Sequence, residues 1–284
     1  MNTTEYLSKW AISYKDDIIN NIMPFWMKYG LDREHGGVYT CVNRDGSLMD
    51  TTKSVWFQGR FGFIAAYAYN NIEKNPQWLA ASKSCIDFIE AHCFDTDGHM
   101  FFEVTEDGKP LRKRRYVFSE GFAAIAMAEY ALATGEKEYA KKALDIFKRT
   151  LHFLNTPGFL EPKYLPTLPS RGHSITMILI NTASRIRMVI DDPSLTEQID
   201  TSIAALRKYF IHPEFKALLE MVGPDGEFID TCNGRVINPG HCIETAWFIM
   251  EEAKYRNWDK DLLQLALQIL DWSWEWGWDK EFGG

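Results

Sequence analysis

Long hydrophobic runs, paired cysteines and an excess of basic residues are all missing from this 284-residue sequence. No apolar stretch approaches the roughly 20 residues of a membrane span. The first ten residues, Met1 to Trp10, are polar and lack the apolar core of a signal peptide. These absences predict a cytoplasmic protein with no membrane partner. The net charge of −8 argues against nucleic acid as a partner, because phosphate binding favours a basic surface.

Cysteine spacing excludes a disulfide framework and a cysteine zinc site, because the five cysteines are odd in number, scattered and never spaced as CxxC. The histidines outside the motif described below are isolated in loops or at helix ends, so we predict no metal. A phosphate-binding P-loop is also absent. One basic cluster stands in a loop, and it is either a solvated loop or an anion site for a phosphate or nucleotide. Its members are Lys109, Arg112, Lys113, Arg114 and Arg115.

Helical periodicity dominates what is present, and the length suits one large domain over residues 1–284. We expect helices at 3–29, 55–72, 76–93, 118–134, 136–154, 172–190, 194–210, 240–256 and 259–276. Short strand-like stretches stand in the loops, at 37–41, 100–104 and 227–230. Asn43-Arg-Asp-Gly46 and Glu106-Asp-Gly108 predict tight turns of small β-hairpins.

A weak internal repeat links the loops between helices. Tyr29-Gly-Leu-Asp-Arg-Glu-His-Gly-Gly37 is similar to Trp276-Gly-Trp-Asp-Lys-Glu-Phe-Gly-Gly284, with related loops between them. A period of about 60 residues with two helices per unit is typical of a ring or solenoid of helical hairpins. We therefore expect an all-α ring or solenoid of helical hairpins.

The most informative segment is Asn233-Gly-Arg-Val-Ile-Asn-Pro-Gly-His-Cys-Ile-Glu-Thr-Ala-Trp247. Asn238 and Pro239 predict a capped helix start, which places His241 in the first turn. Glu244 follows at i+3 on the same face. The helix dipole disfavours an imidazolium there, so His241 tends to stay neutral and able to accept a proton. The alternative is a capped helix whose histidine and glutamate only hydrogen-bond each other or the backbone.

This segment resembles the N-acylglucosamine 2-epimerase family, as do Val55-Trp-Phe-Gln-Gly-Arg60 and Phe118-Ser-Glu-Gly-Phe122. The resemblance implies an all-α (α/α)6 toroid, and because fewer helices are readable than six hairpins need, we expect it to be incomplete in this chain, truncated at its C-terminal side. The resemblance also implies C2 epimerisation of a sugar by two histidines, of which His241 matches one. The second lies in a C-terminal segment of the family that this chain stops short of. The resemblance further implies no required cofactor, ATP as an activator, and a homodimer.

Epimerisation beside a carbonyl needs a base, an acid and a donor to the enediolate oxygen. We assign His241 as acid/base, with Glu244 orienting it or binding a sugar hydroxyl. Arg60 and Arg235 are candidates to stabilise the enediolate or bind the sugar, although each could instead hold a salt bridge or its own loop. Five candidates stand near the starts of alternate helices, so we expect them to converge at one mouth of the ring: Trp56, Arg60, Glu120, His241 and Glu244.

Two more substrate-binding candidates stand at helix starts. Trp56 could stack on the sugar or pack in the core, and Glu120 could line the pocket or cap its helix. His173 is offset from Met177, where cellobiose-type relatives carry a histidine, so we expect His173 at a helix surface. That departure favours an N-acyl hexosamine over a glucosyl disaccharide.

Four functions therefore stay open. The first is interconversion of N-acyl-D-glucosamine and N-acyl-D-mannosamine, and the second is another aldose 2-epimerase or aldose–ketose isomerase of the same family. The third is an (α/α)6 glycoside hydrolase with Glu120 and Glu244 as its two carboxylates. The fourth is a non-catalytic sugar-binding remnant.

Overall fold

The computed structural model describes residues 2–113 and 116–284. It divides into two compact units, one of Met1–Leu160 with Met188–Ile190 and the other of Glu161–Arg187 with Asp191–Gly284. Helices dominate both units, and the strands are at most four residues long in the part of the chain described. No helix in those ranges combines the length and the apolar character needed to cross a bilayer.

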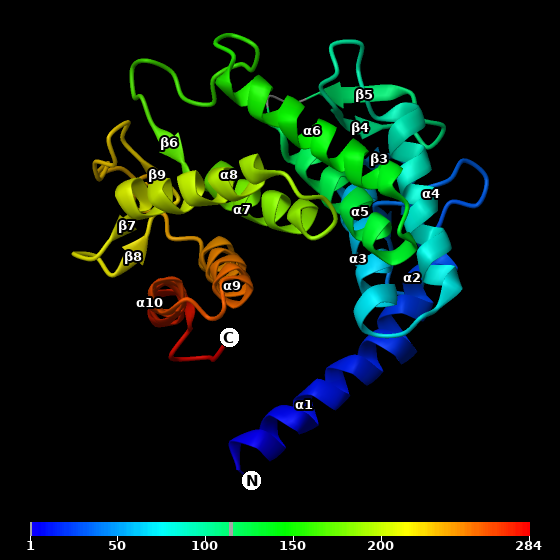
Figure 1. Ribbon diagram of the computed structural model, residues 1–284, viewed down its shortest axis with the longest axis horizontal. Helices are drawn as coiled ribbons and strands as arrows, with labels where there is room; N and C mark the ends of the chain where they lie inside the picture. The colour runs from blue at the N-terminus through cyan, green and yellow to red at the C-terminus, as the bar shows by residue number, and fades with distance from the viewer. Residues whose placement is uncertain (1, 114–115) are drawn as a thin grey trace. The chain divides into compact units, whose positions relative to one another are not determined.

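The first unit is built from helical hairpins (Figure 1). Helix α3 packs against α4 and α5, and α5 packs against α6. The helices are α1 (Thr3–Asp17), the π-helical turn η1 (Ile18–Ile22), α2 (Met23–Tyr29), α3 (Val55–Asn71), α4 (Pro76–His92), α5 (Phe118–Thr134) and α6 (Lys137–Asn155). The antiparallel strands are β1 (Cys41–Val42) with β2 (Leu48–Asp50), and β3 (Lys53–Ser54) with β4 (Phe101–Val104) and β5 (Pro110–Lys113).

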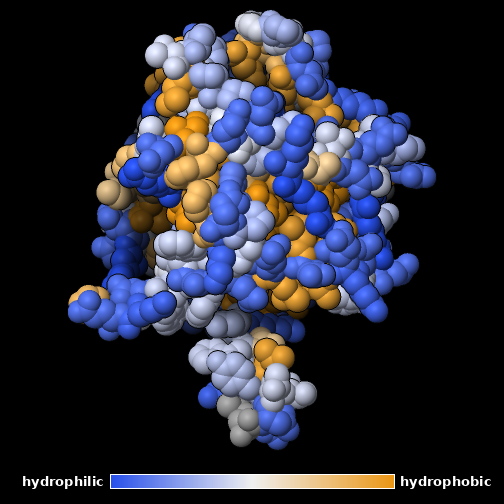
Figure 2. All heavy atoms as spheres, turned by 90° about the vertical axis from the view of Figure 1, so that its left-hand side faces the viewer, coloured by the Kyte–Doolittle hydropathy of each residue, from blue (hydrophilic) through white to orange (hydrophobic). Residues whose placement is uncertain are grey.

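The second unit repeats the hairpin plan, with α7 packed against α8 and α9, and α9 against α10. Its helices are α7 (His173–Arg187), α8 (Pro193–Ala205), the π-helical turn η2 (Leu206–Phe210), α9 (Pro239–Tyr255) and α10 (Lys260–Gly277). Strand β6 (Arg171–Gly172) pairs with β9 (Met221–Val222), and β7 (Ile211–His212) with β8 (Ala217–Leu218). On the side that carries β7, β8 and α10, apolar side chains reach the surface in patches between hydrophilic ones (Figure 2).

An Asn or Asp followed by Pro starts three of these helices. Asn75 precedes α4, Asp192 precedes α8 and Asn238 precedes α9, and each side chain accepts a hydrogen bond from a first-turn amide. The proline that follows has no amide to leave unpaired, and its ring fixes the helical φ. These local signals explain why the predicted helices are confirmed to within a few residues at their starts.

The hairpins at Asn43–Gly46 and Glu106–Gly108 are also confirmed, but the strand predicted at 227–230 is wrong. The backbone there has no regular structure and runs between the turns at 224–225 and 232–235. The amide of Gly223 donates to the carbonyl of Glu227 at 2.8 Å, and the amide of Thr231 donates to that of Ile229 at 2.7 Å. The pairs β6–β9 and β7–β8 were not predicted, because two-residue strands show no alternation of polar and apolar residues.

Close backbone approach joins α3 to α5. Helix α5 is rich in alanine and buried over most of its length. A Cβ added at Gly59 of α3 would lie 2.6 Å from the carbonyl carbon of Phe122. Only glycine therefore fits at this contact, which brings the Val55–Arg60 and Phe118–Phe122 motifs together within the first unit.

The two similar loops seen in the sequence, Asp32–Gly37 and Asp279–Gly284, make the same pattern of hydrogen bonds in the structure. In Asp32–Gly37 the aspartate Oδ1 accepts the amides of the residues two and three positions later, at 2.9 and 3.0 Å. In Asp279–Gly284 the same two bonds measure 2.8 and 2.9 Å. Each aspartate amide also donates to the carbonyl of the last glycine. Both glycines of each pair have positive φ, which glycine adopts without strain.

A buried lysine anchors the first of these loops. Lys53 is fully buried, and its ammonium donates at 2.7 Å to Asp32 Oδ2 and at 2.8 Å to the carbonyls of Gly36 and Glu106. Burial acts to raise the pKa of Asp32, but hydrogen bonds from Lys53 and from two loop amides hold it below its ordinary value. All three ammonium protons are therefore used to tie the loop to the β4–β5 turn.

Candidate functional site

His241 lies in the first turn of α9, as the sequence predicts. Its amide donates to the side chain of Asn238 at 3.3 Å, and Pro239 occupies the first helical position. The next residue, Cys242, is buried, and its thiol donates to the carbonyl of Leu218 at 3.5 Å. Burial raises the pKa of Cys242 to about 11, so it is a packing thiol that fixes the helix start against β8.

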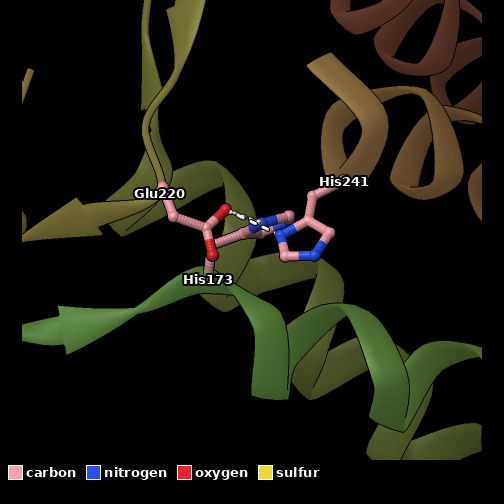
Figure 3. Close-up of side chains that lie close together, drawn as sticks. All are labelled: His173, Glu220 and His241. Atoms are coloured by element: carbon pink, nitrogen blue, oxygen red, sulfur yellow. Dashed lines mark hydrogen bonds and ion pairs between the residues drawn. The ribbon is translucent and has the colours of Figure 1, made fainter. Parts of the chain in front are cut away.

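Glu220 is the carboxylate that pairs with His241. It stands between β8 and β9, and its Oε2 lies 2.9 Å from Nδ1 of His241 (Figure 3). The amide of Glu220 donates to the carbonyl of Val236 at 3.2 Å, which ties this segment to the loop that leads into α9. Sequence reasoning missed Glu220 and assigned the orienting role to Glu244 instead.

His173 completes the cluster from the start of α7. The β6–β9 pairing brings it to Glu220, whose carbonyl accepts the His173 amide at 3.1 Å. Its Nδ1 points at Glu220 Oε2 from 3.6 Å, and its Nε2 lies 2.9 Å from the hydroxyl of Thr245 on α9. His173 is fully buried, so the prediction of a helix-surface histidine is wrong. Two short strands carry its side chain inward.

The two histidines and burial act in opposite directions on Glu220. Burial alone would raise its pKa, but hydrogen bonds and positive charge from His173 and His241 lower it to about 2. Burial lowers the pKa of His173 itself, against the attraction of Glu220. Near neutral pH Glu220 is therefore an ionised carboxylate, and burial favours the neutral form of His173.

These shifts predict a loss of stability on acidification. A histidine whose folded pKa lies below its ordinary 6.5 stabilises the fold above that value, and the contribution is lost as pH falls below it. The lowered pKa of Glu220 adds a second loss, from its ordinary 4.5 towards about 2. Urea unfolding followed from pH 7.5 to 5 should therefore show a smaller decline in His173→Gln than in the unmodified chain. An equal decline in both would contradict the assignment to His173.

The ionised Glu220 fixes the tautomer of His241. A carboxylate only accepts hydrogen bonds, so Nδ1 of His241 must carry the proton that it donates. In the neutral ring Nε2 then holds the lone pair, on the side of the imidazole away from Glu220 (Figure 3). The side chain of His241 is 35% exposed, against 21% for Glu220 and none for His173. His241 is thus the member of the cluster that can exchange a proton with a bound molecule.

The other two candidates of this unit are Glu244 and Arg235. Glu244 is half-buried on α9, and its catalytic role stays a prediction. Arg235 is exposed and donates to Asp230 at 2.7 Å, so it holds its own loop, the alternative weighed from the sequence. Arg235 also lines an apolar hollow of about 470 Å³ with Phe215, Phe228 and Trp276, which His173, Glu220 and His241 do not line.

The remaining candidates belong to the first unit. Trp56 packs edge-on against Phe102, Phe118 and Phe122, and the guanidinium of Arg60 lies 4.4 Å from the ring centre of Phe122. Both side chains keep exposed surface, so substrate contact stays a prediction for each.

Glu120 is buried, with 1% of its surface exposed. Its Oε1 accepts the amide of Met100 at 2.7 Å and contacts Nδ1 of His99 at 2.6 Å. These bonds show a carboxylate that holds the chain leading into β4, which is the structural alternative. Its predicted contact with a sugar is not supported by this burial.

The basic cluster is neutralised where the structure describes it. Lys109 pairs with Asp107, Arg112 lies 3.9 Å from Glu103, and Lys113 bridges Asp95 and Asp97. Arg114 and Arg115 lie outside the described residues. The described part favours the solvated-loop interpretation, and ATP binding stays a prediction.

Comparison with known proteins places the chain in a family. The family model for N-acylglucosamine 2-epimerase matches residues 37–284. The chain is 29% identical to the rat N-acylglucosamine 2-epimerase over 94% of this chain and 65% of the relative, and 29% identical to the human one over 94% and 64%. It thus spans about two thirds of the length of these curated relatives.

A solved cellobiose 2-epimerase from Bacillus thermoamylovorans B4167 superposes with a TM-score of 0.84 at 20% identity. The match covers 96% of this chain and 74% of that one. At this identity the likeness shows the fold alone, and it confirms the predicted all-α class of (α/α)6 barrels of helical hairpins.

Proposed function

Because this chain belongs to the N-acylglucosamine 2-epimerase family, we propose that it is a sugar 2-epimerase that interconverts N-acyl-D-glucosamine and N-acyl-D-mannosamine. The observation that carries the proposal is the partly exposed His241, whose Nδ1 is paired with the ionised Glu220. The curated relatives at 29% identity bear the name of this activity, which supports the choice of sugar.

The chemistry follows from the tautomer. In the open-chain sugar the hydrogen on C2 is acidic, because the neighbouring carbonyl accepts the electrons that its removal leaves behind. Nε2 of His241 takes this proton, and the resulting imidazolium is stabilised by the negative charge of Glu220. Return of a proton to the opposite face of C2 gives the other epimer.

His173 serves as a positioning residue in this scheme. It has no exposed surface, so it does not reach a substrate. Through Thr245, whose hydroxyl donates to the carbonyl of His241 at 2.8 Å, it helps to hold the first turn of α9. The second acid/base is therefore a different group, and the family resemblance implies a histidine further along the family's chain.

Incubation in D2O tests the proposal. We expect deuterium to enter C2 of N-acetylmannosamine or N-acetylglucosamine, detected as loss of the C2 proton signal. If the chain carries an acid/base on only one face of the sugar, deuterium should enter one sugar without formation of its epimer. If it carries an acid/base on each face, deuterium exchange should be accompanied by epimer formation. No exchange in either sugar would overturn the proposal.

The glycoside hydrolase alternative receives less support. It needs two carboxylates that reach a scissile bond, and one of those assigned to it, Glu120, has 1% of its surface exposed. We further propose a cytoplasmic location, a homodimer and ATP as an activator, all of which rest on the sequence and its family resemblance.

A further inference from the structure

We propose that His173, Glu220 and His241 form a binding site for a divalent transition-metal ion such as Zn²⁺, in which the ion inhibits proton transfer. Two imidazoles and one carboxylate are a ligand set that zinc and related ions bind in proteins. The ligand atoms of these three residues lie within 4.8 Å of one another. No other such group of His, Cys, Asp and Glu occurs in residues 2–113 and 116–284.

The hydrogen bonds of Thr245 fix the tautomer of His173. The hydroxyl proton of Thr245 goes to the carbonyl of His241 at 2.8 Å. The same oxygen lies 2.9 Å from Nε2 of His173, so it must accept a proton from that nitrogen. A neutral His173 that donates from Nε2 has its lone pair on Nδ1.

That lone pair points at a carboxylate. Nδ1 of His173 is buried and has no hydrogen-bond partner, and the nearest charged atom is Oε2 of Glu220 at 3.6 Å. Two electron-rich atoms then face each other with no proton between them, and the nitrogen of the pair is buried. A buried polar atom left in this state is costly, and a cation held between the two atoms removes the cost.

The spacing suits a small tetrahedral ion. Zinc holds nitrogen and oxygen ligands at about 2.1 Å, so its ligand atoms stand roughly 3.4 Å apart. The separations from Glu220 Oε2 are 2.9 Å to Nδ1 of His241 and 3.6 Å to Nδ1 of His173, which bracket that value. Glu220 and His241 keep exposed surface, so the ion has a route of entry and room for a water as its fourth ligand.

Metal binding would change the tautomer of His241. When Nδ1 binds an ion it gives up its proton, and the neutral ring then carries its proton on Nε2. This step rests on the proposed function: a ring with Nε2 protonated cannot accept the C2 proton of a sugar. The ion is therefore an inhibitor that competes with the proton on Nδ1, and catalysis requires no metal.

Binding is tested first without sugar. The chain is treated with a chelator, dialysed and titrated with Co²⁺, because visible d–d bands report nitrogen and oxygen ligation directly. Zn²⁺ affinity is then measured by calorimetry. We expect one ion per chain, with Glu220→Gln and His241→Asn each lowering the affinity at least tenfold. The inference is overturned if the unmodified chain does not bind one ion, or if both variants bind Zn²⁺ as tightly as the unmodified chain does.

Glu214→Gln is the matched control. Glu214 faces His212 at 2.9 Å, the same distance as in the Glu220–His241 pair, but its side chain is 57% exposed and has no second histidine in its pair. Zn²⁺ affinity should be unchanged in this variant, and a loss equal to that in Glu220→Gln counts against the site. One equivalent of Zn²⁺ should also stop deuterium exchange at C2. Continued exchange at full occupancy refutes the inhibition, whereas exchange that is absent even before metal is added refutes the proposed function.

Discussion

His241→Gln should lower the rate of deuterium exchange at C2 by roughly 10²–10⁴-fold, the range expected when a positioned acid/base is lost. The amide of glutamine can still donate a hydrogen bond towards Glu220, but it has no lone pair of comparable basicity to accept a proton. The fold should be retained, because the helix cap of α9 is made by the side chain of Asn238 and the backbone of residue 241. The initial exchange rate in D2O, at saturating sugar, is the measurement.

Two further variants separate chemistry from structure. Glu220→Gln keeps the shape of the side chain but removes the charge that stabilises the imidazolium, so we expect a smaller loss of rate, in kcat rather than in KM. His152→Gln, at an exposed position at the end of α6, should exchange at the unmodified rate. Full activity in His241→Gln would show that another group takes the C2 proton.

Lys53→Met should destabilise the first unit by about 3–5 kcal/mol, the usual result of breaking a buried ion pair by removing one partner. Methionine fills a similar volume, so the loss comes from charge and hydrogen bonding. Asp32 Oδ2 and the carbonyls of Gly36 and Glu106 all lose their donor at once. The measurement is the protection of α3 and α5 amides from hydrogen exchange, which reports this unit separately from the second.

Lys83→Met is the control for that prediction. Lys83 pairs with Asp87 one helical turn away on α4, where the lysine is partly exposed and the aspartate is exposed, in contrast to the fully buried Lys53. Such a pair contributes about 0.3–0.5 kcal/mol. Equal effects at Lys53 and Lys83 would mean that the buried ammonium does not hold the loop.

Most of the fold could be predicted because its signals are local. Helix starts such as Asn75-Pro76 and Asn238-Pro239 combine a cap and a fixed φ within two residues, and long amphipathic stretches follow them. The strand predicted at 227–230 failed because its two apolar residues, Phe228 and Ile229, are adjacent and the segment runs irregularly between two turns. The extent of the single domain predicted for residues 1–284 stays a prediction.

Only part of the site could be predicted, because its contacts join residues that are far apart in the sequence. His241 stands in a motif, but Glu220 lies 21 residues before it and Thr245 lies 72 residues after His173. Two-residue strands make these long-range connections, and such strands leave no periodic trace in a sequence. One signal in the sequence could have pointed to Glu220. It is an acidic residue within the apolar stretch from Ala217 to Val222, where a carboxylate is unexpected unless it has a buried partner.

The twin loops Asp32–Gly37 and Asp279–Gly284 bear on how such a chain arose. Each is closed by one aspartate and its own backbone, with the same donors and acceptors in the same order. These shared hydrogen bonds form within the turn itself and do not depend on the helices around it, whereas the bonds of the first loop to Lys53 and Ser84 are additional. Copying a gene segment would thus carry the turn along intact, while the flanking helices were free to diverge and take on separate tasks.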